Sequence, residues 1–319
     1  MKLFEKLFGR GQAKDTPVLL AVIDRAVNQV EPLLKQNSRY RKIYRKAVIT
    51  ALEYANRLSA SVPGPVAINR QTFASDAFVH ALFPSVDVVK ESFCASEAVG
   101  NYHREFPETN EIFALMGMRR VEKNVIGAEL VNETIQHDVV QTIIYFNNHT
   151  IENLAPTEKE ARELIAMSFF DNLVRKVKTR VDERKQVMQA QLQEKNLLEA
   201  RLRTATKQQR PALQKDLTKL IAEMQSTAAA LDLRNYVNDF EAILLNPQQH
   251  LQLNQIPMYL DSMGIKRESF DANRDKEVVF SELFGFDRRN WTVTLVHCSS
   301  FKNEIFDNKL EMAYRKLCI

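Results

Sequence analysis

The sequence predicts a helix-rich α+β fold: N-terminal helices pack with a small antiparallel sheet, and a long two-helix hairpin is inserted between the two halves of that sheet. Three patterns support this prediction. Apolar residues follow a heptad repeat within residues 157–247, and they follow a helical period with capping residues before residue 107. On both sides of the hairpin they alternate with polar residues, as strands do.

Residues 1–16 are expected to form a short amphipathic segment. The segment is basic on one side and lacks the continuous apolar core of a signal peptide. It can lie in a membrane interface, dock onto a protein surface or fray, so peripheral membrane contact through residues 1–10 is one expectation. Its apolar side consists of Leu3, Phe4, Leu7 and Phe8.

Residues 17–156 are expected to form a helical region followed by the first part of the sheet. Thr16 and Pro17 supply a cap and a first-turn proline for a helix that reaches about Leu34. A second helix is predicted over 38–59, and two shorter ones over 72–82 and 85–102. The second helix is predicted to bury a stripe of Tyr40, Ile43, Ala47, Ala51, Tyr54 and Leu58.

Period-two alternation begins near Ile112 and predicts three strands, over 112–118, 120–131 and 139–146. Gly127 is a candidate for a bulge, and the polar residues 132–138 are expected to connect the last two strands.

Residues 157–247 are predicted to form the hairpin arm. Pro211 fits the first turn of a helix but not its interior, so the turn falls within 204–211, and the outer part of the arm would project roughly 40–50 Å. A phase slip through the small residues 228–230 indicates a stutter in the second helix. The seam of the first helix reads Met167, Phe170, Val174, Val177, Val181, Arg184, Met188, Gln191, Lys195, Leu198, Leu202 and Ala205. The seam of the second reads Leu213, Leu217, Leu220, Met224, Leu233, Val237, Phe240 and Leu244.

Residues 248–319 are predicted to complete the α+β body. Strands are expected over 255–265, 277–284 and 291–298, and we expect them to join the sheet that begins near Ile112. The chain then ends in an amphipathic helix over about 301–317.

Positive charge is concentrated on the predicted arm. Residues 175–223 contain thirteen Lys/Arg and six Asp/Glu, a net of +7, whereas the whole chain is +4, which leaves −3 for the rest. A basic elongated surface attracts phosphate backbones or anionic membranes, although a solvated helical face has the same composition. Near the turn, the candidate interaction residues are Arg201, Arg203, Lys207 and Arg210. Residues 39–46 interleave basic and aromatic side chains, which suits single-stranded nucleic acid or ordinary core packing.

The sequence contains no recognisable catalytic signature, and it predicts no cofactor, metal centre or catalytic residue. Glycine is scarce, at eight residues, which argues against phosphate-cradling loops. One segment resembles an EF-hand loop, with oxygen donors at Asp271, Asn273, Asp275 and Glu282. Lys276 replaces the glycine that such a loop needs, and a strand pattern follows where a helix is required, so a polar loop that leads into a strand is the favoured interpretation.

These patterns favour a non-enzymatic scaffold or adaptor that uses the arm to bind a protein partner or a second copy of itself. A nucleic-acid-associated protein is the alternative, and an enzyme with a site assembled from distant residues is the third class. The isolated cysteines Cys94, Cys298 and Cys318 favour a reducing compartment, and no apolar run is long enough to cross a bilayer. The expected location is therefore cytoplasmic, with peripheral membrane contact as an option.

Overall fold

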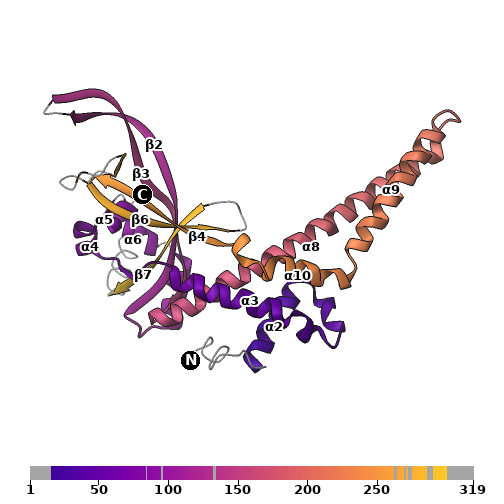
Figure 1. The fold of residues 1–319 in the computed structure, drawn as a ribbon, viewed down its shortest axis with the longest axis horizontal. Helices are drawn as coiled ribbons and strands as arrows, with labels where there is room; N and C mark the ends of the chain where they lie inside the picture. Colours follow the sequence, from indigo (N-terminus) through magenta and orange to yellow (C-terminus); the bar gives the residue numbers. More distant parts are fainter. Residues whose placement is uncertain are drawn as a thin grey trace, which may run out of the picture. The chain divides into compact units, whose positions relative to one another are not determined.

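The structure is a computed structural model that describes residues 16–83, 85–94, 96–131, 134–261, 264–268, 271, 275–285 and 290–299 (Figure 1). The chain forms two compact units. In the described residues, the first comprises 16–54 and 170–250, and the second comprises 55–169 and 251–299. Both the N-terminal segment 1–15, with Leu3, Phe4, Leu7 and Phe8, and the helix predicted over 301–317 lie outside the described residues.

Runs of helices and runs of strands follow one another along the chain, as in an α+β fold, which confirms the predicted fold class. Helical elements before the sheet are α2 (Pro17–Val30), η1 (Pro32–Gln36), α3 (Tyr40–Ser61), α4 (Arg70–Ser75), α5 (Ala77–Leu82), α6 (Val86–Cys94) and α7 (Glu97–Glu105). Those after its first part are α8 (Glu158–Thr204), α9 (Arg210–Ala230), η2 (Leu233–Asn235), α10 (Tyr236–Leu244) and η3 (Pro247–Gln249). The strands are β1 (Val66–Ala67), β2 (Glu111–Val131), β3 (Thr134–Ala155), β4 (Gln252–Asp261), β5 (Ile265–Arg267), β6 (Asp275–Phe284) and β7 (Asn290–Ser299).

The first unit is built from α2, α3, α10 and most of α8. Thr16 caps α2 as predicted, because its hydroxyl accepts a hydrogen bond from the Leu19 amide. The stripe predicted for α3 is partly wrong: Ile43 is exposed, whereas Tyr44 is buried. The reason is the Tyr44 ring, which packs on Phe240 with 4.5 Å between ring centroids and so turns that face of α3 inward.

The hairpin of α8 and α9 confirms the predicted helical arm. The second helix is not continuous, however, because α9 ends at Ala230 and the chain restarts through η2 into α10. Asp232 caps that restart by accepting a hydrogen bond from the Arg234 amide. The stutter expected at residues 228–230 is therefore a break, although the seam residues Leu233, Val237, Phe240 and Leu244 all remain at least half-buried.

The second unit is organised on one mixed sheet of seven strands in the order β1-β7-β2-β3-β5-β4-β6. All pairs are antiparallel except β1 with β7, and β6 also pairs with β7. Because β2 pairs with β7 along residues 111–118, the strands before and after the arm belong to the same sheet, as the sequence predicted. Helices α4 to α7 pack on this sheet, and the shared core includes Val79, Phe83, Val99 and Phe280.

Two local predictions in this unit are wrong. Four short helices replace the two expected, because Asp76 and Ser96 cap new helices inside the predicted spans. Two long strands replace the three predicted strands, because β2 runs unbroken over Glu111–Val131, and residues 134–136 pair with it instead of forming a loop. The register does shift between Gly127 and Glu129, but the extra residue lies on β3, so the bulge is at Asp138 and not at Gly127.

Candidate interaction surface on the helical arm

The outer arm is a thin two-helix structure. In α8 and α9 the less exposed positions are the seam residues predicted from the heptads, since Met188, Gln191, Lys195, Leu202, Leu213 and Leu217 are half-buried. Only Leu198 and Leu220 are buried between residues 182 and 230, all of which the structure describes. The two helices lie side by side in Figure 1. A pair of helices with so little core presents nearly all of its side chains to solvent.

The turn of the arm is held by local hydrogen bonds. The Gln209 side-chain oxygen accepts bonds from the Thr206 amide and hydroxyl, and the Leu213 amide bonds back to the Gln209 carbonyl. Pro211 lies in the first turn of α9, where its missing N–H leaves no helical bond unmade. The sequence therefore placed the turn correctly.

An ion-pair cluster fixes the base of the arm. Asp239 of α10 is buried and accepts hydrogen bonds from both terminal nitrogens of Arg184, each at 2.7 Å, and Arg180 approaches the same carboxylate at 3.1 Å. A bidentate pair of this kind sets the orientation of both helices as well as their separation. Nearby, the Lys185 ammonium lies 2.7 Å from Glu31, and this hydrogen bond is the main cause of a lowered pKa for the Glu31 carboxyl.

These base contacts shorten the free part of the arm. Because Lys185 still pairs with Glu31 and Arg184 still pairs with Asp239, only the stretch of α8 from residue 185 to 204 extends beyond them. At 1.5 Å per residue this is about 28 Å, less than the 40–50 Å expected from a continuous second helix.

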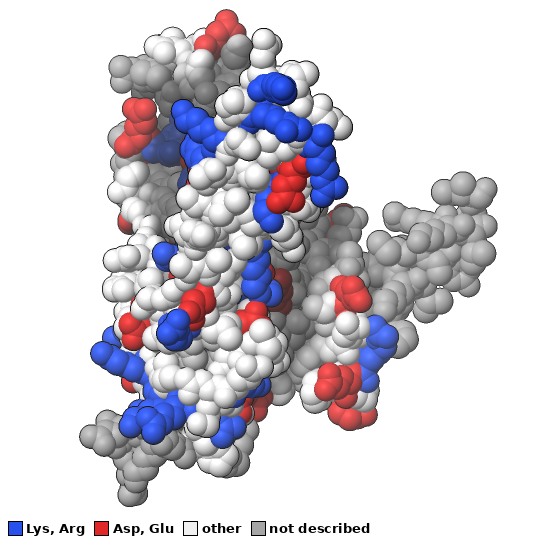
Figure 2. Space-filling view, turned by 90° about the vertical axis from the view of Figure 1, so that its right-hand side faces the viewer, with Lys and Arg blue, Asp and Glu red and all other residues white. Residues whose placement is uncertain are grey.

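The end of the arm carries a basic tip, which we define as Arg201, Arg203, Lys207, Arg210 and Lys215. All five side chains are exposed, and no ion pair in the described part of the chain involves any of them. Several other basic residues of α8 and α9 are paired, as Lys178 is with Asp182, Lys195 with Glu199 and Lys219 with Glu223. Figure 2 shows one face of the molecule, where lysines and arginines are interspersed with carboxylates and a larger uncharged area.

Helix electrostatics do not account for the whole tip. Arg201 and Arg203 lie in the last turn of α8, where a positive charge favours the helix dipole. Arg210 begins α9, however, and the first turn of α9 contains no acidic residue and no side-chain cap. A cation at that end opposes the dipole, so Arg210 is placed where it reduces the stability of the isolated helix.

The basic and aromatic residues 39–46 are arranged differently. Arg41 and the Tyr40 hydroxyl both bind Asp24, which lowers the pKa of Asp24 to about 2 through the Arg41 bond first and the Tyr40 bond second. Tyr44 is buried against Phe240. The Tyr44 ring is therefore not free to stack on a nucleic-acid base, and the Arg41 guanidinium lies over one face of the Tyr40 ring, 5.6 Å from its centroid.

The segment that resembles a calcium loop does not form a cage. Asp275 and Glu282 both lie on β6, and seven residues of strand separate them by about 23 Å. Glu282 is buried and pairs with Arg120 at 2.7 Å. Asn273 lies outside the described residues, and no group of three potential ligands, Asp271 included, could hold a metal ion in the part of the chain that the structure describes.

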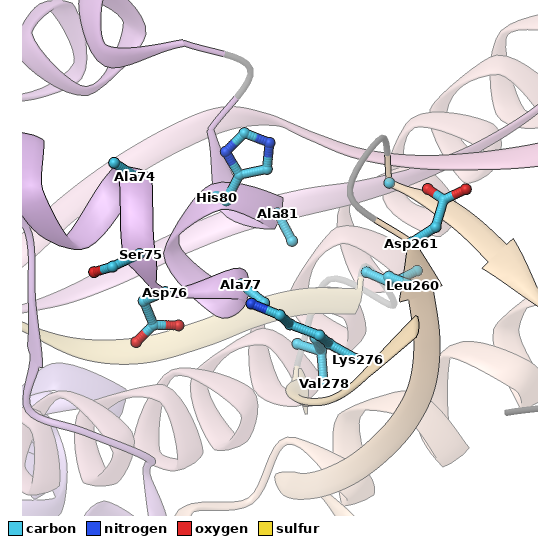
Figure 3. A pocket seen from close by; sticks show the side chains of 11 residues that line it. Ala74, Ser75, Asp76, Ala77, His80, Ala81, Leu260, Asp261, Lys276 and Val278 are labelled. Atoms are coloured by element: carbon cyan, nitrogen blue, oxygen red, sulfur yellow. The ribbon is translucent and has the colours of Figure 1, made fainter. Parts of the chain in front are cut away.

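A shallow pocket of about 280 Å³ lies in the second unit between α4, α5 and strands β4 and β6 (Figure 3). Its titratable rim residues are Asp76, His80, Asp261 and Lys276. Asp76 caps α5, and the Ser75 hydroxyl donates to the Gln71 carbonyl instead of to His80. The geometry thus includes no hydroxyl activated by the histidine, and it does not indicate catalysis.

Asp239 is the residue that sequence reasoning missed. It pairs with an arginine 55 positions earlier in the chain, and neither residue stands in a recognisable motif. Arg184 appeared only as a polar interruption of the seam, which was the one available signal.

No helix in the described residues is both long and apolar enough to cross a membrane. No family model, no curated protein and no solved structure matches the chain. The candidate surface therefore stands on its own geometry and charge.

Proposed function

We propose that the protein is a non-enzymatic scaffold or adaptor whose arm docks onto an acidic surface of a partner protein through the basic tip. The main support for this proposal is the unpaired positive charge at the turn between α8 and α9. Arg210 opposes the dipole of α9, and no carboxylate pairs with Lys207 or Arg210 among the described residues. An acidic partner would supply the missing counter-charge.

The shape of the first unit supports the same proposal. The base of the arm is fixed by buried ion pairs, whereas its outer part buries only two side chains. A rigidly based hairpin therefore displays charge away from the core of its unit. Electrostatic complementarity of this kind contributes mainly to association rate and partner choice. The free, buried thiol of Cys298 suits a cytoplasmic location for such an adaptor.

The test compares two variants of equal charge change. The tip variant carries R201E, R203E, K207E and R210E, and the control carries R39E, K42E, K46E and R57E on exposed positions of α3 and the residue before it. Each variant is used as full-length bait in quantitative affinity capture, with and without nuclease. Substitution is preferred to deletion of residues 180–232, because that deletion would also remove Arg180, Arg184 and Lys185 from the base.

We expect at least a tenfold loss of specific protein partners with the tip variant and retention of these partners with the α3 control. Nuclease should leave this difference unchanged. If the captured proteins disappear after nuclease treatment, the basic tip binds nucleic acid instead. If the tip variant and the control capture the same partners equally, the tip is an ordinary solvated helix end and the proposal is wrong.

A further inference from the structure

The two long strands of the second unit, β2 and β3, differ in regularity: one of them is interrupted by bulges and the other is not. The register of β2 against β3 shifts three times, and at each shift β3 contains one residue more than β2. These shifts coincide with positive φ angles at Asp138, Asn148 and Asn153, all on β3. Asparagine and aspartate tolerate this conformation better than other residues, so β3 is the bulged strand and β2 is the regular one.

The outer edge of β2 is open over its distal half. Strand β7 pairs with β2 only as far as Met118, and beyond it no described strand pairs with that edge. Proteins usually protect exposed edges with bulges, prolines or charges. The free edge of β3 has a bulge at Asp138, whereas β2 runs through Val125, Ile126, Gly127 and Ala128 with none of these devices.

One face of this ribbon exposes apolar side chains beyond the polar pair Asn124 and Thr142. Ile126 stands directly opposite Val140, and the two residues are 74% and 68% exposed. Ile135 is 59% exposed and lies on the same face, because its partner at position 130 is four residues from Ile126 on the regular strand. Figure 1 shows the ribbon of β2 and β3 continuing past the other strands of its unit. A two-stranded ribbon by itself is only marginally stable in water.

We propose that a second copy of the chain pairs with this edge, β2 against β2 and antiparallel, about a two-fold axis at Ile126. In this register each Ile126 stands opposite its mate, and the row Val140, Ile126, Ile126, Val140 forms one continuous apolar strip across four strands. An isologous contact of this type closes on itself as a dimer.

The charges flanking the apolar run select a second copy as the partner. Lys123 lies three residues before Ile126, and position 129, a glutamate, lies three residues after it. An antiparallel pairing centred on Ile126 therefore places Lys123 of each copy opposite residue 129 of the other, twice in every dimer. Centring the pairing on Val125 or Gly127 instead would leave Lys123 opposite Gly127 or Val131.

Charge reversal tests the register. Self-association of the full chain is measured by sedimentation equilibrium for wild type, K123E, E129K and the double variant K123E/E129K. Each single reversal should weaken the dimer roughly tenfold, because the axis makes every substitution count twice, and the double variant should recover the wild-type dissociation constant. K215E on the arm is the matched control and should leave the dimer unchanged.

Cysteine cross-linking tests the axis. With I126C the two thiols would lie on directly opposed residues, about 5 Å apart at Cβ, so oxidation should give a disulfide-linked dimer. The control V140C has a similarly exposed cysteine on the same face, but its mate is three strand spacings away, about 14 Å, which is too far for a disulfide. Both positions are exposed, so neither substitution removes core packing.

Wild type that remains monomeric at all accessible concentrations overturns the proposal. So does a dimer that is insensitive to both single charge reversals, or equal cross-linking of V140C and I126C. These outcomes are independent of the arm, because the tip variant of the proposed function should dimerise normally and K123E should retain the partners of the arm.

Discussion

The clearest energetic prediction concerns Asp239 at the base of the arm. Its side chain is 3% exposed and accepts two hydrogen bonds from Arg184, which is 27% exposed, and one contact from Arg180, which is 49% exposed. Breaking a buried ion pair by removing one partner costs about 3–5 kcal/mol, because the remaining charge loses its compensation.

The structure sets a different magnitude for each substitution. D239A should reduce the free energy of unfolding by about 3 kcal/mol, at the low end of that range, because both arginines can turn toward solvent. R184A should cost a similar amount, since it leaves the buried carboxylate with only the longer Arg180 contact. R180A should cost about 0.5–1 kcal/mol, because Arg180 is half-exposed and screened by water.

Urea unfolding followed by circular dichroism would measure these differences, with R203A at the exposed tip as a control that should stay within about 0.5 kcal/mol of wild type. The double variant R184A/D239A should be only about as unstable as either single variant, which means a coupling energy of about 3 kcal/mol. Equal costs for R180A and R184A, or additive costs in the double variant, would refute the assignment of Arg184 as the principal partner.

Two further predictions concern the second unit. Burial lowers the pKa of the His149 imidazole, whose Nε2 lies 2.9 Å from the Leu82 carbonyl oxygen. At a pH near or below the usual histidine pKa of 6.5, His149 therefore binds a proton more readily in the unfolded chain than in the folded one. The free energy of unfolding should fall as the pH drops from about 7.5 to 5.5. H149F should reduce this pH dependence in urea titrations, and an unchanged dependence would assign it to other groups. G64A should destabilise the fold by 3 kcal/mol or more, on the order of the largest single-residue effects, because Gly64 has φ of 109° and a Cβ there would overlap the Leu295 carbonyl oxygen. G100A is the control in α7, where no atom lies within 4 Å of the new Cβ, and thermal unfolding should show it to be slightly stabilised by about 0.5–1 kcal/mol.

The helical seam could be predicted because apolar residues repeat along it, but the break in the second helix could not. Residues 228–230 are three alanines, which favour helix, and neither glycine nor proline marks the end. The break allows Asp239 to face Arg184, and that contact joins residues 55 positions apart in the chain. Packing across that distance overrides local propensity.

The start of β3 was missed for a related reason. Strands are recognised by alternation between a buried and an exposed face. Residues 134–138 are exposed on both faces, so their polar sequence reads as a loop although residues 134–136 pair with β2. The same absence of burial that concealed the strand from the sequence leaves its neighbour β2 with an open edge.

The arm and the ribbon pose the same physical question. An ordered residue costs about 1–2 kcal/mol of backbone entropy, and this is normally offset largely by burying apolar surface. Between residues 182 and 230 the arm buries only Leu198 and Leu220, and the outer ribbon exposes Ile126 and Val140. Internal hydrogen bonds keep such segments folded, but they contribute little net free energy. Contacts outside the chain are therefore the natural source of the missing stabilisation, and the two segments differ in what they offer: the arm presents unpaired charge, and the ribbon presents an apolar edge. An acidic partner at the tip and a second copy at the ribbon satisfy these two needs separately, which is why each proposal can fail without the other.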